Sequence, residues 1–190
     1  MQQDTLLVRK MQNGDEEAMA VFVQKYYPRI LQYCRYHCTD RESAQDLTQE
    51  TFEKFFRNLA AYHHSGKILN YLYTIARNLC IDWGRKNKEV YIGDYSKERR
   101  AGDGRYGEAG CGNSGETGTE DRTDGIEDKV LIEEALGKLA EELREVVILH
   151  YFQELSLRET AAVLQAGLPL VKYRIGKAKE KLKEVLSCVP

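Results

Sequence analysis

The residues with the clearest potential for chemistry in this 190-residue sequence are cations near its C-terminal end. Six basic residues and one acid, Glu180, lie between Leu170 and Lys183. The apolar residues of this segment have helical spacing, and a basic helix attracts phosphate groups through its charge. A capped helix and a short break, AGLP, precede the segment, which is the pattern of a helix-turn-helix. We therefore expect this end of the chain to contact DNA.

A second candidate contact surface lies on the helix predicted over residues 71–88, YLYTIARNLCIDWGRKNK. One face of this helix is an apolar stripe made of Leu72, Ile75, Ala76, Leu79 and Trp83. The opposite face carries Asn70, Thr74, Arg77, Asn78, Ile81 and Arg85. Charges alone would favour a solvated face, but the aliphatic Ile81 among them favours a surface that meets a partner.

A third candidate surface is predicted on the helix that begins after Thr39 or Asp40, either of which can cap it. The apolar face of this helix is made of Ala44, Leu47, Thr48, Thr51, Phe55 and Leu59. The opposite, polar face is made of Asp46, Gln49, Glu50, Glu53 and Arg57. We expect the first face to be buried and the second to be open.

The sequence does not predict an enzyme. We find no nucleophile with an adjacent base, no phosphate-binding loop and no need for a cofactor. Cys34, His37 and Cys38 are close together, but no second pair of ligands completes a metal site, so we expect buried thiols and no metal. A hydrolase that uses His63, His64 and Asp82 is disfavoured, because the two histidines lie in a short loop without visible partners.

Composition and apolar runs indicate a globular protein outside the membrane. The net charge is −2, and 42% of the residues are hydrophobic. The longest apolar runs are far too short to span a bilayer, and the N-terminus lacks the pattern of a signal peptide. We therefore expect a cytoplasmic protein without membrane insertion.

Glycine content divides the chain. Nine of the fifteen glycines fall within residues 93–125, a segment almost without aliphatic residues. Residues 89–129 hold eleven acids and six bases. Because such a segment cannot bury enough surface to offset its chain entropy, we expect a flexible acidic linker over residues 89–125. The fold class is predicted to be all-α, with helical domains over residues 1–88 and 126–190.

Local signals predict where several helices begin and end. Asp15 is expected to cap the helix that follows Asn13-Gly14, and Pro28 is expected to bend or split it. Ser156 and Glu159 have capping-box spacing, and a helix is predicted over each of the segments 126–139, 140–155 and 156–165.

Taken together, these segments resemble a known family. The stretches GDEEAM, YYPRI, AQDLTQETFEKFFRNL, NYLYTIARNLCIDWGRK, LREVVILHYFQELSLRETAAVL and VKYRIGKAKEKLK are similar to those of the extracytoplasmic-function (ECF) sigma factors of bacterial RNA polymerase. The resemblance covers nearly all of residues 1–88 and 126–187. It implies a dissociable polymerase subunit that recognises the −10 and −35 promoter elements and promotes strand opening.

The resemblance also implies partners and contact residues. The first domain is similar to sigma region 2, whose matching helix docks on the β′ clamp helices of the core polymerase through Asp46, Gln49, Glu50 and Glu53. The −10 element is implied to meet Asn58, Tyr62, His63, Lys67, Asn70, Thr74, Arg77, Asn78 and Arg85, with Tyr62 or His63 as the aromatic group that stacks on a flipped base. The second domain is similar to region 4, which implies −35 contacts by Lys172, Tyr173, Arg174, Lys177 and Lys179. Further implied partners are the β flap of the polymerase and an anti-sigma factor.

One alternative stays open at this point. A free-standing helix-turn-helix regulator with a helical sensor domain would share the basic C-terminal helix. Such a regulator has no need of the polar face around Glu50, which is what discriminates the two functions. Two promoter elements about one and a half turns apart lie roughly 50–60 Å from one another, so a flexible linker alone does not set their spacing. We therefore expect the polymerase to hold the two domains apart.

Overall fold

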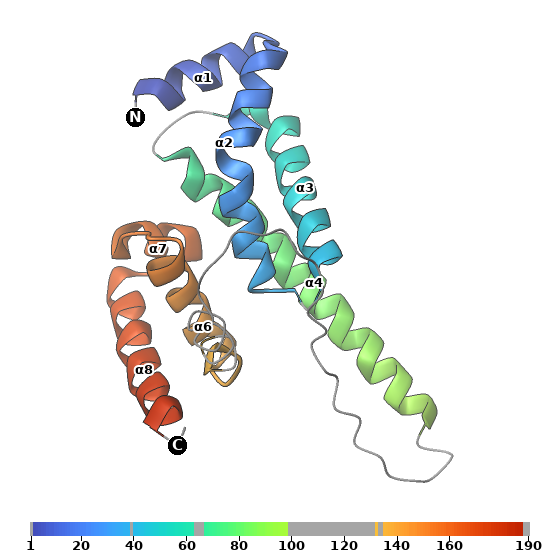
Figure 1. Ribbon diagram of the computed structural model, residues 1–190, viewed down its shortest axis with the longest axis vertical. Coiled ribbons are helices and arrows are strands. Elements are labelled where there is room, and N and C mark those ends of the chain that lie inside the picture. The colour runs from blue at the N-terminus through green and yellow to red at the C-terminus, as the bar shows by residue number, and fades with distance from the viewer. Residues whose placement is uncertain (1, 39, 63–66, 99–131, 133–134, 188–190) are drawn as a thin grey trace, which may run out of the picture.

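The computed structural model describes residues 2–38, 40–62, 67–98, 132 and 135–187 (Figure 1). The first module contains α1 (Gln2–Gln12), α2 (Glu16–Arg35), α3 (Arg41–Arg57), the 3-10 turn η1 (Leu59–Ala61) and α4 (Ile68–Glu98). The second module contains α6 (Glu141–Val147), the π-helical segment η2 (Ile148–Phe152), α7 (Leu157–Leu164) and α8 (Leu168–Ser187). Within these ranges there is no strand, so the predicted all-α class is confirmed.

Capping side chains begin the helices where the sequence predicted them to begin. Asp15 accepts a hydrogen bond from the backbone N–H of Ala18, and Asp40, one of the two candidates, accepts one from Ser43. Each bond satisfies a donor that the first turn of a helix leaves without a partner. Pro28 was expected to bend or split its helix, and the split is excluded, because α2 continues through it to Arg35. Pro28 is exposed, so the carbonyl that loses its donor lies towards the solvent side.

An aromatic core joins α2, α3 and α4. Phe22 of α2 is fully buried and stacks on Phe55 of α3 with ring centroids 4.8 Å apart, while Phe52 meets it edge-on at 6.1 Å. The face of α3 predicted to be buried is buried, and its hydroxyls on Thr48 and Thr51 donate to backbone carbonyls one turn earlier. The three helices therefore form one bundle without unpaired hydroxyls in this face.

The second module contains the predicted helix-turn-helix. Ser156 and Glu159 form a capping box at the start of α7, and Gln165 ends that helix in the left-handed region with φ of 51°. Val171, Ile175 and Ala178 of α8 are buried against the rest of the module. The remaining face of α8 is exposed, as the helical spacing of its apolar and basic residues predicted.

The structure differs from the predicted helix pattern in two places. α4 continues ten residues past the predicted boundary at Lys88, to Glu98. The helix predicted over residues 140–155 ends as a π-helical segment, and Glu154 then takes a positive φ of 57°. Most of the helix predicted over residues 126–139 lies outside the described residues, as do residues 99–125 of the predicted linker.

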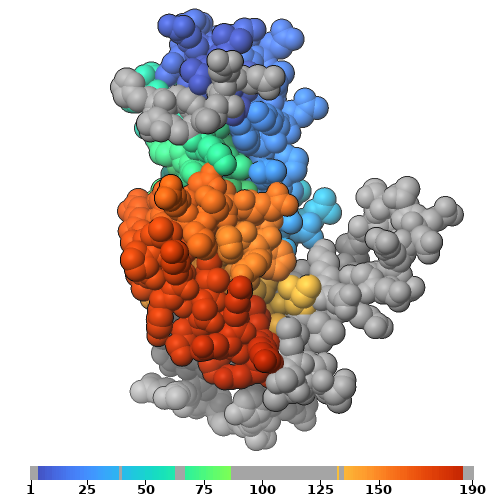
Figure 2. Space-filling view, turned by 90° about the vertical axis from the view of Figure 1, so that its left-hand side faces the viewer, coloured from blue at the N-terminus to red at the C-terminus, as the bar shows by residue number. Residues whose placement is uncertain are grey.

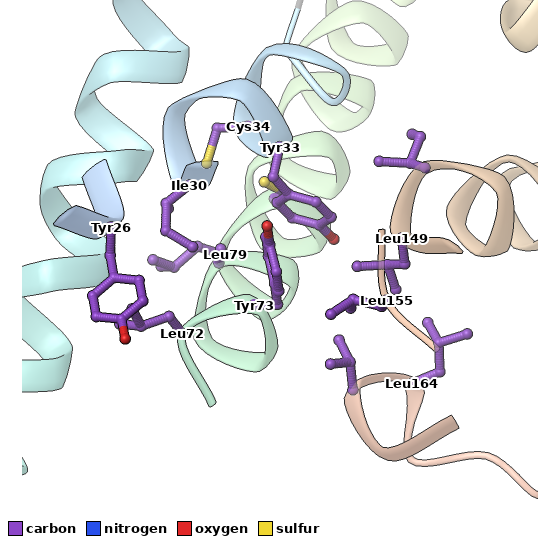
Figure 3. Close-up of a cluster of buried hydrophobic side chains, with 14 of the residues drawn as sticks. Tyr26, Ile30, Tyr33, Cys34, Leu72, Tyr73, Leu79, Leu149, Leu155 and Leu164 are labelled. Atoms are coloured by element: carbon purple, nitrogen blue, oxygen red, sulfur yellow. The ribbon is translucent and has the colours of Figure 1, made fainter. Parts of the chain in front are cut away.

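The two modules are packed against one another. Figure 2 shows the orange and red second module in contact with the green first half of α4, and α4 packs on α7. Leu149, Leu155 and Leu164 of the second module face Tyr33 and Tyr73 of the first, all of them buried (Figure 3). One continuous core therefore runs through both modules.

Replacing Phe22 with alanine tests this account of the bundle. Because Phe22 is fully buried among three helices, we expect Phe22→Ala to lower the free energy of unfolding by about 3–5 kcal/mol. Val21→Ala is the matched control, since its side chain is 48% exposed and should change stability by less than about 0.5 kcal/mol. Urea unfolding followed by circular dichroism measures both, and equal losses would contradict the assignment of the core.

Candidate nucleic-acid interface

The polar face of α3 lies open on the side away from the aromatic core. Asp46, Gln49, Glu50 and Glu53 are all exposed. Glu50 pairs with Lys54 one turn later at 3.1 Å, and the Gln49 amide donates to Glu53 at 3.3 Å. These exposed i,i+4 contacts are weak and can be exchanged for contacts with a partner. The face is therefore an exposed ridge of three carboxylates and one amide.

The segment that follows α3 is held by a residue that sequence analysis missed. The side-chain amide of Gln12 in α1 donates to the backbone carbonyls of Leu59 and Tyr62, at 3.0 Å each. The Tyr62 ring is half-buried and stacks on Tyr71 with centroids 5.1 Å apart. The position of Tyr62 is thus set by its stacked ring and by the hydrogen bond to its carbonyl. No local pattern could have indicated Gln12, because its partners lie about fifty residues away.

Asn58 and His63 complete this part of the predicted set. Asn58 ends α3, and its side-chain amide donates to the carbonyl of Lys54 at 2.9 Å. His63 lies outside the described residues. The Asn58 amide therefore bonds to the last turn of α3 in this structure.

The predicted contact face of α4 divides into an open part and a covered part. Asn78, Ile81 and Arg85 are exposed, and Arg85 pairs with Asp82 in its own helix at 3.0 Å. Thr74 donates its hydroxyl to the carbonyl of Asn70, and both are half-buried. The exposed Ile81 agrees with the sequence analysis.

Lys67 and Arg77 contact the second module. The Lys67 ammonium lies 2.6 Å from a carboxylate oxygen of Glu159 in α7. The Arg77 guanidinium lies 3.7 Å from Glu145 in α6. Both cations are in the set that sequence analysis assigned to the −10 element. In this structure both cations lie next to carboxylates of the second module.

The basic face of α8 is exposed for most of its predicted residues. Lys172, Tyr173, Lys177 and Lys179 are exposed, and Tyr173 has 62% of its surface accessible. Arg174 is half-buried and donates to Glu142 of α6 at 2.6 Å. Gly176 lies on the same face, and a methyl group added there would meet no atom within 4 Å. This face of α8 is therefore open to solvent along most of its predicted residues.

Glu145 is a buried contact residue between the modules that the sequence analysis did not identify. Its side chain is buried between the modules, with 7% of the residue exposed. One carboxylate oxygen accepts a hydrogen bond from the Tyr33 hydroxyl at 2.5 Å, and the other lies 3.4 Å from Nε2 of His37. The sequence offered one indication that this residue is buried: Glu145 directly precedes the apolar run Val146 to Leu149.

Other polar and aromatic pairs also join the two modules. The buried Tyr73 hydroxyl donates to the side-chain oxygen of Gln153 at 2.7 Å. The rings of Tyr36 and Phe152 lie 4.9 Å apart.

Glu159 is partly desolvated, which raises the pKa of its carboxyl, but hydrogen bonds from Lys67 and Ser156 outweigh this and lower the pKa to about 2. Glu159 is therefore ionised at every physiological pH.

The thiols in this region have structural surroundings. Cys34 and Cys80 are buried, share a hydrogen bond between α2 and α4, and are not in a disulfide. Among the described residues no three side chains are arranged to hold a metal ion. None of the described helices is long and apolar enough to cross a membrane.

Comparisons with known proteins agree with this two-part arrangement. The model of sigma-70 region 2 matches residues 22–90, and that of sigma-70 region 4 matches residues 129–182. The two modules thus define a transcription initiation factor of the sigma-70 class. The ECF RNA polymerase sigma factor SigW of Bacillus subtilis (strain 168) is 30% identical over 179 residues, which are 94% of each chain. The chain belongs to the ECF sigma factors, which confirms the predicted family and function.

Solved structures share the fold over almost the whole chain. CnrH in complex with the cytosolic domain of CnrY has a TM-score of 0.72 at 21% identity, and the match covers 98% of this chain and 99% of CnrH. The sigma factor RpoE in complex with the anti-sigma factor NepR from Bartonella quintana has a TM-score of 0.59 at 21% identity, over 90% and 98%. At this identity they show the fold.

Because His37 is largely buried at the contact between the two modules, we predict that the stability of the folded chain depends on pH. Burial lowers the pKa of His37, and the nearby Arg144 and Arg77 lower it too, while Glu145 and Glu141 oppose them. The folded imidazole is therefore neutral at pH 7, and its contact with Glu145 is not an ion pair. In the unfolded chain the pKa of a histidine is about 6.5. The contribution of His37 to stability is thus present above this pH and is lost as pH falls below it.

We expect the free energy of unfolding of the wild type to fall more steeply below pH 6.5 than that of His37→Gln. The difference in slope should be at most about 1.4 kcal/mol per pH unit, the value for one proton. Urea unfolding at pH 7.5, 6.5 and 5.5 measures it for both proteins. Parallel pH profiles would contradict a neutral, buried His37.

Proposed function

We propose that this ECF sigma factor divides its task between residues 1–88, which bind the core polymerase and the −10 element, and residues 126–190, which bind the −35 element. Residues 89–125 link the two. The observation that carries this proposal is the presence of two open, chemically distinct helix faces on one chain. The polar ridge of α3 and the basic face of α8 are both directed away from their cores.

The α3 ridge is proposed to dock on the β′ clamp helices of the polymerase. Exposed carboxylates suit a basic partner surface and increase the rate of association through charge. A free-standing regulator has no use for such a ridge, and this disfavours the alternative function. The second module is proposed to contact the β flap as well, as the family resemblance implies.

The −10 surface is proposed to comprise the end of α3 and the polar face of α4. Cations there hold the phosphates of a melted strand, and amides and aromatic rings contact its bases. The proposed residues are Asn58, Tyr62, His63, Lys67, Asn70, Thr74, Arg77, Asn78 and Arg85. Gln12 is added as a positioning residue, because it fixes the two carbonyls from which this segment departs.

The −35 surface is proposed to be the exposed side of α8. A recognition helix lies in the major groove, where its early residues reach base edges and its cations reach phosphates. The proposed residues are Lys172, Tyr173, Arg174, Lys177 and Lys179. Since sigma factors guide initiation without chemistry of their own, we propose no catalytic step for this chain and place it in the cytoplasm with the polymerase.

An anti-sigma protein is proposed as a further partner. RpoE of Bartonella quintana is bound by the anti-sigma factor NepR, and CnrH by the cytosolic domain of CnrY. This chain shares their arrangement of helices. Exposed apolar side chains such as Leu170 and Tyr173 on the second module are the groups that a protein inhibitor would cover.

Reversing one charge on the α3 ridge tests the polymerase contact. Glu50→Lys should lower retention of the protein by immobilised core polymerase by at least about tenfold, because it places a cation in a surface proposed to meet a basic partner. Glu17→Lys on α2 is the control, as it makes the same exposed charge change outside the ridge. Equal retention of both variants would exclude the ridge as the docking site.

Removing one cation from α8 tests the DNA contact. Lys172→Ala should weaken binding of the holoenzyme to promoter DNA and reduce the slope of log affinity against log salt by about 1, the value for one phosphate contact. Lys181→Ala removes a cation from another side of α8, where its partner is Glu184, and should leave the slope unchanged. Titrations at several salt concentrations measure both, and identical slopes would contradict the assignment.

A further inference from the structure

Gly176 occupies a position at which glycine is unfavourable. It lies inside α8, which continues through it without a break from Leu168 to Ser187. In the interior of a helix only proline is less favourable than glycine, because glycine has no side chain to pack and loses the most backbone freedom on folding. A glycine at such a position therefore needs a reason in packing, in backbone geometry or in binding.

Neither packing nor backbone geometry supplies that reason. Apart from its two neighbours in the chain and the backbone of its own helix, a Cβ atom at Gly176 would meet no atom of the described residues within 4 Å. The backbone of Gly176 does not need a glycine either, because among the described residues Gly14 is the glycine with a positive φ, of 85°. The turn at Gly14 explains that residue, whereas for Gly176 binding is the reason that is left.

Gly176 lies on the side of α8 that is proposed to enter the major groove, at an edge of the molecule (Figure 1). Lys172 and Tyr173 lie about one turn before it on the same side, and both are exposed. Helical side chains lean towards the N-terminus, so a side chain at position 176 would lie over these two residues. Since glycine has none, the surface has a gap there, and 62% of Tyr173 is accessible.

We propose that Gly176 is a specificity-determining residue of the −35 contact, because its gap admits the C5-methyl group of a thymine against the Tyr173 ring. The groups around the gap are carbon: the Gly176 Cα, the aromatic ring and the methylene chain of Lys172. In the major groove the apolar group that base edges present is the thymine methyl group. The proposal rests on the −35 role proposed for α8 and goes beyond it, since it assigns one chemical group of the DNA to one residue.

A side chain at position 176 would remove this contact. A methyl group in van der Waals contact lies about 3.5–4.0 Å from the carbon atoms that it touches. A Cβ atom would stand between the methyl group and the helix backbone and would push the base edge away from the ring. The cations on this face keep their phosphate contacts in that case, because such contacts position the helix without reading sequence. The gap therefore affects the choice of base and leaves the general attraction to DNA intact.

Gly176→Ala and Gly176→Leu test the gap without weakening the helix. Alanine and leucine both favour a helix over glycine, so Gly176→Ala should raise the melting temperature by about 2–4 °C. A loss of recognition in these variants is therefore not a result of unfolding. Gly84→Ala is the matched control, because Gly84 lies inside α4 and a Cβ atom there would likewise meet nothing within 4 Å among the described residues.

The first measurement is selection by the holoenzyme from promoter fragments with a randomised −35 element and a constant −10 element, followed by sequencing. At one position we expect the preference for thymine to fall from at least about fivefold in the wild type, a usual lower cost of a mismatched base pair, to less than about twofold in both Gly176 variants. Tyr173→Ala should lose the preference at the same position. Gly84→Ala should keep every preference of the wild type.

The second measurement replaces each thymine of the selected element in turn by uracil, which lacks only the methyl group. At the affected position, uracil should weaken binding of the wild-type holoenzyme about fourfold, the value for one buried methyl group. The same replacement should leave binding by the Gly176→Leu holoenzyme unchanged, because its side chain already excludes the methyl group. Fluorescence anisotropy of the labelled fragments measures both.

Unchanged base preferences in Gly176→Leu would overturn the proposal, and so would an equal loss at all positions, which indicates a lost phosphate contact. Equal binding of the thymine and uracil fragments by the wild type would overturn it as well. If the wild-type holoenzyme selects no −35 sequence, the proposed −35 function itself fails. A clear selection that the Gly176 variants do not alter refutes this inference alone.

Discussion

The arrangement of this protein depends on one buried charge. Glu145 belongs to the second module, but the groups that compensate its carboxylate belong to the first: the Tyr33 hydroxyl and the Arg77 guanidinium. A desolvated carboxylate without such partners would cost several kcal/mol. Docking of the modules and satisfaction of this charge are therefore a single event.

This docked state and the promoter-bound state require different distances. Compact modules of this size have radii of gyration of about 10–12 Å, so two of them in contact have centres about 30 Å apart or less. Promoter elements one and a half turns apart lie roughly 50–60 Å from one another. Since Lys67 and Glu159 are 2.6 Å apart here, the modules must part before both elements can be read together. We propose that the polymerase supplies the energy for this separation.

What the sequence predicts well is what local chemistry decides. Asp15, Asp40 and the Ser156–Glu159 pair begin their helices because a cap bonds to backbone only a few residues away. The buried stripe of α3 follows from helical periodicity alone. Pro28 shows the limit of local rules, because α2 continues through it to Arg35. The missed residues, Gln12 and Glu145, have partners about fifty and more than one hundred positions away, and no spacing rule connects them.

The distance between the modules tests the central claim most directly. Labels introduced through unnatural amino acids at the exposed Gln24 of α2 and Lys181 of α8 avoid the native thiols, and pulsed electron paramagnetic resonance measures their separation. Our account predicts one short, dominant distance in the free chain and an increase by roughly 20–30 Å, the difference between the docked and promoter spacings, on binding core polymerase. The same distance distribution in the free chain and in the holoenzyme would contradict it.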